Sequence, residues 1–299
     1  AARQRVRLPQ RLPGYADFDG REEALNMLLL GFGSADTPRM WNLVLVKTLA
    51  EFSLSLSTTD PQLFLKHKSV QSAITLVLIV SAYDDDLKGA SQNEERECFL
   101  AHLEAKFGNS KHATRSFEHV CIVHEQGADG SIVVRQHGYA KTLRLIDLSG
   151  RKLEDADTLA PPELASAFQT LLGGAAWLTM FCLAICVYVS YLQRRNKAPS
   201  FKHLRDLNRV VKWIQLHPQS LTFRRLKMPT KLVCVSDSSF SAGDSEGLVM
   251  RGGVLLLVEV DSIDLPCGKV QVVDWFARKQ PHVCRSTFAA ELHAALDAL

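Results

Sequence analysis

Hydrophobic positions in the first third of the chain fall into two patterns. After Thr37-Pro38, a pair that suits the start of a helix, apolar residues recur at helical spacing and predict a helix to about Phe52. Residues 63–83 are instead strand-like, with the densest apolar run at 74–80. A helix followed by a buried strand is therefore expected at this end of the chain.

A second helix and a hairpin are predicted downstream. Ser91 and Glu94 have the spacing of a capping box, and Gly108 is suited to end the helix that would begin there. Residues 115–136 alternate between apolar and polar on either side of 127–130, a pattern typical of a β-hairpin. These elements favour an α/β fold of the α+β kind, in which helices and strands occur in separate runs.

The second half of the chain begins with a polar, Pro-containing linker. The elements predicted after it are a long apolar helix (171–192), a basic helix (202–216), three strands (231–240, 248–260 and 270–278) and an amphipathic helix from Ser286 onward. The apolar helix has no charge and is followed by Gln193-Arg194-Arg195. That pattern fits a membrane span, and it equally fits a helix buried between two modules.

Composition narrows the class of protein only slightly. The net charge of +3 is small, so any binding of nucleic acid must come from local patches. The seven cysteines form no CxxC pair, which favours reduced thiols and an intracellular compartment. The first residues are basic and Pro-rich without an apolar stretch, so no signal peptide is expected.

Three consecutive carboxylates, Asp84-Asp85-Asp86, follow the apolar run at 74–80. One explanation is an acidic turn that faces solvent. The other is a site for a divalent metal, because adjacent carboxylates repel one another unless a cation lies between them.

A second pair of acids lies near the end of the chain, where Asp237 closes a strand and Glu291 lies on the last helix. At about 100° per residue, one face of that helix is shared by Phe288, Leu292, Ala295 and Leu299. Glu291 lies at the edge of this face, toward the predicted sheet, and Asp297 on the opposite face, toward solvent. Either two separate surface acids or one Mg²⁺ site between Asp237 and Glu291 fits this geometry.

Several short motifs resemble copia-type retrotransposon polyproteins. SDSSF (236–240), VDWFARKQPHV (273–283) and RSTFAAEL (285–292) are similar to their RNase H region. Upstream, Tyr83-Asp84-Asp85-Asp86 resembles the Tyr-x-Asp-Asp hairpin of their reverse transcriptase. LLLGFGSADTPRMW (28–41) resembles the motif that supports the primer–template, and WIQLHP (213–218) the end of the connector. The motifs occur in the order of that family.

The resemblance implies a partial reverse-transcriptase palm and thumb, then a helical connector and a partial RNase H-like domain. The implied boundaries are palm 1–109, thumb-like hairpin and linker 110–160, connector 161–228 and RNase H-like half-domain 229–299. It also implies Mg²⁺, with Mn²⁺ as a substitute, at Asp85 and Asp86 for adding a dNTP to a primer. A second metal site at Asp237 and Glu291 would cleave the RNA strand of a hybrid.

The implied partners are an RNA template, a DNA primer, an RNA/DNA hybrid and the rest of the polyprotein. Between residues 193 and 231, eleven Lys and Arg stand against one acid, which fits either a nucleic-acid track or a solvated helix face. Nucleic-acid contacts are expected at Gly33, Arg39, Tyr83, Arg194, Arg195, Lys202, Arg209, Lys212, Arg224, Arg225 and Lys279.

The sequence departs from the family pattern at both sites. No match to the polymerase's further Asp is found in residues 1–30, and the family's further RNase H Asp would lie beyond Leu299. Lys88 replaces an apolar residue, and MFCLAICV (180–187) replaces an Arg-Pro-Asp stretch. Little or no turnover is therefore expected from this chain alone. The alternatives are a non-catalytic nucleic-acid-binding remnant that uses 193–231 and, less favoured, a membrane-anchored protein that uses 171–192.

Overall fold

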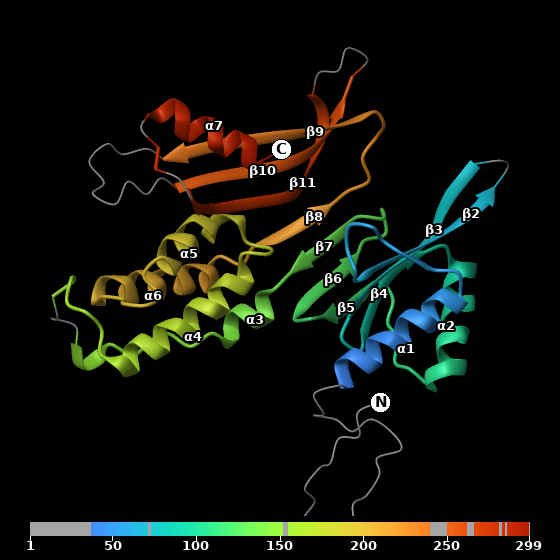
Figure 1. Cartoon of the computed structure of the whole chain (residues 1–299), viewed down its shortest axis with the longest axis horizontal. Helices are drawn as coiled ribbons and strands as arrows, with labels where there is room; N and C mark the ends of the chain where they lie inside the picture. The colour runs from blue at the N-terminus through green and yellow to red at the C-terminus, as the bar shows by residue number, and fades with distance from the viewer. Residues whose placement is uncertain are drawn as a thin grey trace, which may run out of the picture. The chain divides into compact units, whose positions relative to one another are not determined.

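The chain divides into two compact units, one ending at Lys111 and the other beginning at His112. The computed structural model describes residues 37–70, 73–151, 155–239, 250–261, 266–280, 283–284 and 286–298, and Gly33 therefore lies outside the described residues. Within these residues the fold is mixed α/β, with seven α-helices and three sheets in which every pair of neighbouring strands is antiparallel (Figure 1).

The first unit contains one sheet and two helices. Its elements are α1 (Thr37–Glu51), β1 (Ser55–Leu56), β2 (Leu63–Val70), β3 (Ala73–Tyr83), β4 (Asp86–Ser91) and α2 (Asn93–Phe107), and the strands lie in the order β1-β2-β3-β4. Alternate residues of β3, namely Leu78, Val80 and Ala82, join Leu45 and Leu49 of α1 in the core. The sheet thus presents one face to the helices and leaves β3 and β4 to carry the hairpin between Tyr83 and Asp86.

The strand-like pattern over 63–83 is confirmed, and it comprises two strands, β2 and β3, that pair antiparallel with each other. The expected start of the second helix was wrong. Ser91 is the last residue of β4, so the helix starts after Gln92 and has no side-chain cap there. Gly108 does end α2, with a positive φ of 84°.

The second unit begins with a four-stranded sheet in the order β5-β6-β7-β8. Its strands are β5 (Ser116–His119), β6 (Ile122–Gln126), β7 (Ile132–Arg135) and, from much later in the chain, β8 (Ser220–Phe223). The predicted hairpin is confirmed as the β6–β7 pair. Between β7 and β8 the chain forms the helical elements α3 (His137–Thr142), η1 (Ser149–Arg151), α4 (Pro162–Leu178), η2 (Leu183–Ile185), α5 (Cys186–Gln193) and α6 (Phe201–Leu216).

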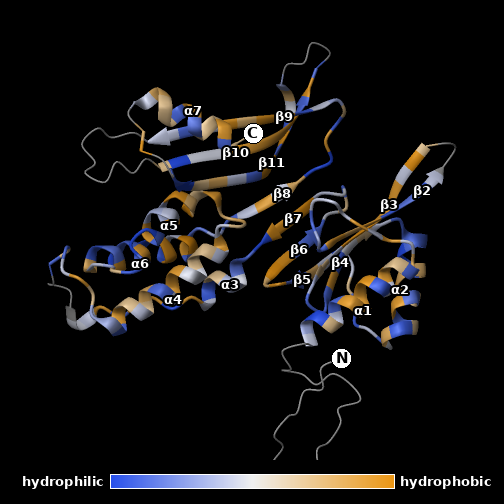
Figure 2. Cartoon of the chain, in the orientation of Figure 1, coloured by the Kyte–Doolittle hydropathy of each residue, from blue (hydrophilic) through white to orange (hydrophobic). Residues whose placement is uncertain are grey.

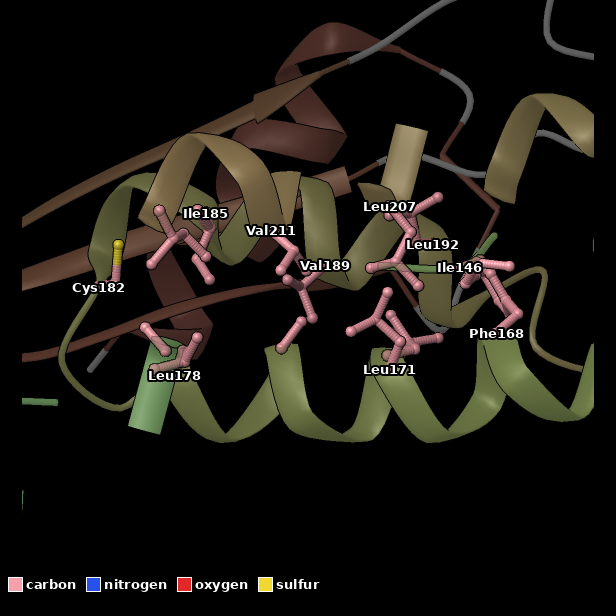
Figure 3. Packing of buried hydrophobic residues seen from close by; sticks show 14 of the residues in the cluster. Ile146, Phe168, Leu171, Leu178, Cys182, Ile185, Val189, Leu192, Leu207 and Val211 are labelled. Carbon is pink, nitrogen blue, oxygen red and sulfur yellow. The ribbon is translucent and has the colours of Figure 1, made fainter. Parts of the chain in front are cut away.

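These helices share one hydrophobic core. Figure 3 shows apolar side chains of α4 pointing toward those of α5 and α6, and Phe168, Leu204 and Leu207 are fully buried there. The predicted helix over 171–192 is wrong, because α4 ends at Leu178 and α5 starts at Cys186. Among the helices that the structure describes, none combines the length and the apolar character needed to cross a bilayer.

Side-chain amides of α6 hold the segment that precedes α4. Asn208 accepts a hydrogen bond from the backbone N–H of Ile146 and donates one to its carbonyl oxygen, both at 2.9 Å. Gln215 donates to the carbonyl oxygens of Ala140 and Leu143 at the end of α3. These hydrogen bonds give partners to backbone carbonyl groups between α3 and α4, where no sheet or long helix is present to bond them.

The last part of the second unit is a three-stranded sheet in the order β11-β10-β9, covered by α7 (Thr287–Asp297) (Figure 1). Its strands are β9 (Thr230–Ser239), β10 (Met250–Val260) and β11 (Pro266–Lys279), near the predicted positions. The predicted apolar face of α7 was wrong. Ala290, Ala294 and Ala298 are buried, whereas Phe288 is 76% exposed. Small side chains let α7 approach the sheet at Gly253, where a Cβ would lie 3.4 Å from that of Ala298.

Candidate metal and nucleic-acid sites

The first candidate site is the tip of the β3–β4 hairpin. Tyr83 pairs with Asp86 across the hairpin, so Asp84 and Asp85 form a two-residue turn. Such turns require positive φ, and Asp84 has a φ of 50°. Asp tolerates that conformation better than most residues because its short polar side chain bonds locally. The sequence therefore suits the tight hairpin that the Tyr-x-Asp-Asp pattern predicted.

Two other residues surround this turn. The indole Nε1 of Trp41, on α1, donates a hydrogen bond of 2.7 Å to the carbonyl oxygen of Asp84. The Trp41 ring also lies 5.1 Å from the ring of Phe107, at the end of α2. On β4, burial lowers the pKa of Lys88, which alternation places on the same face of the sheet as Asp86. The turn is thus held from the helical side and bordered by a partly desolvated ammonium group.

The donor set at the hairpin fits a hard divalent cation in part. Asp84, Asp85 and Asp86 are exposed, and carboxylate oxygens are the ligands that Mg²⁺ and Mn²⁺ prefer. Two adjacent carboxylates supply only some of the ligands, because two-metal sites need more. In the described part of the chain, no group of three or more His, Cys, Asp or Glu side chains is placed to hold a metal.

The second candidate pair is Asp237 and Glu291. Asp237 is exposed on β9 opposite Gly252, and Glu291 is half-buried on α7. Because Arg251 pairs with Asp297 of α7, that helix covers the face of the sheet to which Arg251 belongs. Alternation places Asp237 on the other face, the one to which Trp275 belongs. The described geometry therefore brings the two acids to the same sheet but not to the same side of it.

Asp297 does not face solvent as expected. Its Oδ2 forms ion pairs with Arg251 of β10 and with Arg278 of β11, the latter at 2.9 Å. Arg251 also donates to the side chain of Gln280 at 3.0 Å. These contacts make Asp297 a structural residue that fastens α7 to the sheet.

The basic residues predicted to contact nucleic acid are spread over several elements. On α6, Lys202, Arg205, Arg209 and Lys212 recur every three or four residues, and all but Arg205 are exposed. The opposite face of α6 is buried in the helical core, and Figure 2 shows both hydrophilic and hydrophobic residues around its axis. Of the others, Arg39, Tyr83, Arg224, Arg225 and Lys279 are exposed, whereas Arg194 and Arg195 are half-buried.

No protein-family model, no curated protein and no solved structure matches this chain. A functional argument therefore rests on the residues and their geometry. Sequence reasoning had located the acids and the basic helix. It missed the contact between Trp41 and Asp84, for which the only signal was that both residues belong to motifs of the same resemblance.

Proposed function

We propose that the chain is a part of a retrotransposon polyprotein that acts on RNA and DNA, and that Asp85 and Asp86 bind Mg²⁺ or Mn²⁺ in its polymerase region. The observation that carries this proposal is the hairpin itself. A Tyr-Asp-Asp-Asp sequence lies at a two-residue turn, with the strand before the turn backed by buried Leu78, Val80 and Ala82. A rigid strand that ends in adjacent carboxylates is what metal-assisted phosphoryl transfer requires of its ligands.

Metal ions bound there would neutralise charge on a dNTP and on the primer 3′-oxygen. The chain's own residues would contribute two carboxylates, an exposed Tyr83 beside them, and basic residues that follow the nucleic-acid backbone. Because the resemblance calls for a further Asp that the sequence does not match, metal binding rather than turnover is the property to measure first.

Binding of Mn²⁺, followed by electron paramagnetic resonance of the free ion, tests the metal site directly. We expect Asp85→Asn and Asp86→Asn to weaken binding at least tenfold. Asp84→Asn is the matched control, because Asn also tolerates a positive φ and the resemblance gives position 84 no metal role. Equal binding by wild type and the Asp85→Asn/Asp86→Asn double variant would refute the proposal. A primer-extension assay with Mg²⁺ then compares the same two proteins for dNTP addition.

The second site implied by the resemblance, at Asp237 and Glu291, has weaker support because the two acids lie on different faces of the sheet. Cleavage of the RNA strand of an RNA/DNA hybrid by the wild type, and its loss in Asp237→Asn, would support an RNase H function. Identical products from both proteins would exclude it.

A non-catalytic nucleic-acid-binding function is favoured by one specific observation, the exposed basic stripe on α6. Each phosphate contact contributes a slope of about −0.7 to −0.9 in a plot of log affinity against log salt concentration. Lys212→Gln should reduce the slope by about one such unit for a single-stranded RNA measured by fluorescence anisotropy. Lys47→Gln, an exposed lysine of α1, is the control for loss of one charge. Equal slopes for both variants would contradict a role for α6.

A further inference from the structure

Trp41 and Asp84 are 43 positions apart in the sequence and are joined by one hydrogen bond. The indole Nε1 of Trp41 lies 2.7 Å from the carbonyl oxygen of Asp84. This distance is short for an N–H···O bond. The bond connects Trp41, the last residue of the motif expected to support a primer–template, to the turn that carries the acids.

The atom that accepts this hydrogen bond determines how Asp85 is oriented. The carbonyl group of Asp84 and the N–H group of Asp85 belong to one peptide plane, which is rigid because of its partial double bond. Fixing the carbonyl oxygen of Asp84 therefore fixes the plane that leads into Asp85. The φ of Asp85 is the remaining rotation, and the pairing of Tyr83 with Asp86 that closes the two-residue turn restricts it, so the plane and the turn together set the direction of the Cα–Cβ bond of Asp85.

The indole group is itself held in place. Trp41 and Leu45 lie one turn apart on α1, and Leu45 is 1% exposed in the core of the first unit. The Trp41 ring contacts Phe107, the last residue of α2, with ring centroids 5.1 Å apart. A donor mounted on packed helices can constrain a turn more firmly than water does.

We propose that Trp41 is a positioning residue that sets the direction of the Asp85 carboxylate at the hairpin tip. The proposal rests on the metal site put forward above. It assigns to the end of the segment 28–41 a task beyond supporting nucleic acid, namely holding the acids in a geometry that binds metal.

The test uses the full chain and the variant Trp41→Phe, which keeps an aromatic ring beside Phe107 and removes the N–H donor. His102→Phe is the matched control, because His102 also bonds a backbone carbonyl of another helix, that of Thr48 at 2.9 Å, within the same core. We expect Trp41→Phe to weaken Mn²⁺ binding about fivefold and His102→Phe to leave it within twofold. Deuterium exchange of peptides that cover residues 83–87 should quicken in Trp41→Phe only.

The measurements distinguish failure of the positioning role of Trp41 from failure of the metal site. If both variants lower the urea midpoint of the first unit equally and neither changes Mn²⁺ affinity, Trp41 has only a structural role and the proposal is overturned. If the Asp85→Asn/Asp86→Asn variant binds Mn²⁺ like the wild type, the metal site fails first. In that case unchanged exchange at residues 83–87 in Trp41→Phe would overturn the positioning role as well, since that measurement needs no metal.

Discussion

The buried ion cluster around Glu95 gives the sharpest prediction for the stability of the first unit. The Glu95 side chain is 6% exposed at the start of α2 and forms ion pairs with Lys66 and Lys68 of β2, the former at 2.6 Å. The Lys66 ammonium group also lies 3.6 Å from the centre of the Phe52 ring. Glu95→Gln leaves Lys66, which is 13% exposed, without a countercharge. Removing one partner of a buried pair typically costs 3–5 kcal/mol, so we expect a loss of about 3 kcal/mol at pH 7.

Hydrogen bonds from Lys66 and then Lys68 hold the pKa of Glu95 below its ordinary value. A carboxyl group with a lowered pKa in the folded state stabilises the fold fully above the pKa of the unfolded chain. That stabilisation is lost as the pH falls through the lower folded value. The difference in stability between wild type and Glu95→Gln should therefore be largest above about pH 5 and shrink toward pH 2.

Fluorine NMR of the chain labelled with 5-fluorotryptophan provides the assay, because Trp41 is the only tryptophan before residue 177 and reports the first unit. Urea titrations then give the free energy of unfolding for that unit. Lys66→Met/Glu95→Leu is the matched double variant and should recover most of the loss, since apolar side chains replace buried ion pairs well. A cost below about 1 kcal/mol for Glu95→Gln, or one independent of pH, would refute this account of the cluster.

Two further predictions concern backbone conformation. Gly173→Ala should stabilise α4 by about 0.5–1 kcal/mol, because a Cβ there meets nothing within 4 Å. In Gly174→Ala the added Cβ would lie 2.6 Å from a Leu143 methyl group, so that gain in stability should be lost, and thermal melts of both variants test the difference. Val120 and Cys121 have φ of 51° and 59° in the β5–β6 turn, so Val120→Asn/Cys121→Gly should raise the free energy of unfolding by about 1–2 kcal/mol, and a lower melting temperature would contradict that reasoning.

The sequence predicted α1, α2, the β6–β7 hairpin, α6 and the final three strands with α7, but it did not predict β4, α3 or β8. Which face each helix buries did not always follow either. On α7 the large apolar residues Phe288 and Leu292 predicted the buried face, yet the alanines face the sheet. Helical periodicity shows which residues share a face and gives no information on how closely a neighbour approaches. Gly253 leaves room on this face for the ring of Phe276 and for Ala298 of α7, so a small residue rather than a large one fits the helix face that meets the sheet there.

The stretch 171–192 shows that a hydropathy pattern does not reveal where one helix ends and the next begins. Both α4 and α5 bury residues in the same core, such as Leu172 and Val189. The whole stretch from one helix to the other is therefore uniformly apolar in sequence. The break has only a weak polar signal at Thr179, whose hydroxyl group donates to the carbonyl oxygen of Ala176 at 2.7 Å. No Gly or Pro marks it, and a hydropathy pattern alone cannot separate one long helix from two packed ones.

At the candidate metal site, the sequence predicted the local hairpin, which is confirmed, whereas metal binding there stays a prediction. Apolar residues up to Ala82 and three following acids are enough to place carboxylates at a strand end. The hydrogen bond from Trp41 depends on how α1 packs beside the hairpin, which is a tertiary property. Likewise, the ion pairs of Glu95 join residues 27 or more positions apart. Such contacts have no local sequence signature.

The pairing of β7 with β8 has a consequence for the order of folding. Ile132 pairs with Phe223, so the strands that complete this sheet enclose the whole helical segment between them. Closing so long a loop in an unfolded chain costs roughly 4 kcal/mol in entropy, and much less once α4, α5 and α6 have collapsed and drawn the ends together. The helices, whose contacts are more local, should therefore form before β8 docks. A destabilising substitution in the helical core, at a residue without contact to the β5-β6-β7-β8 sheet, would then slow the docking of β8 onto that sheet.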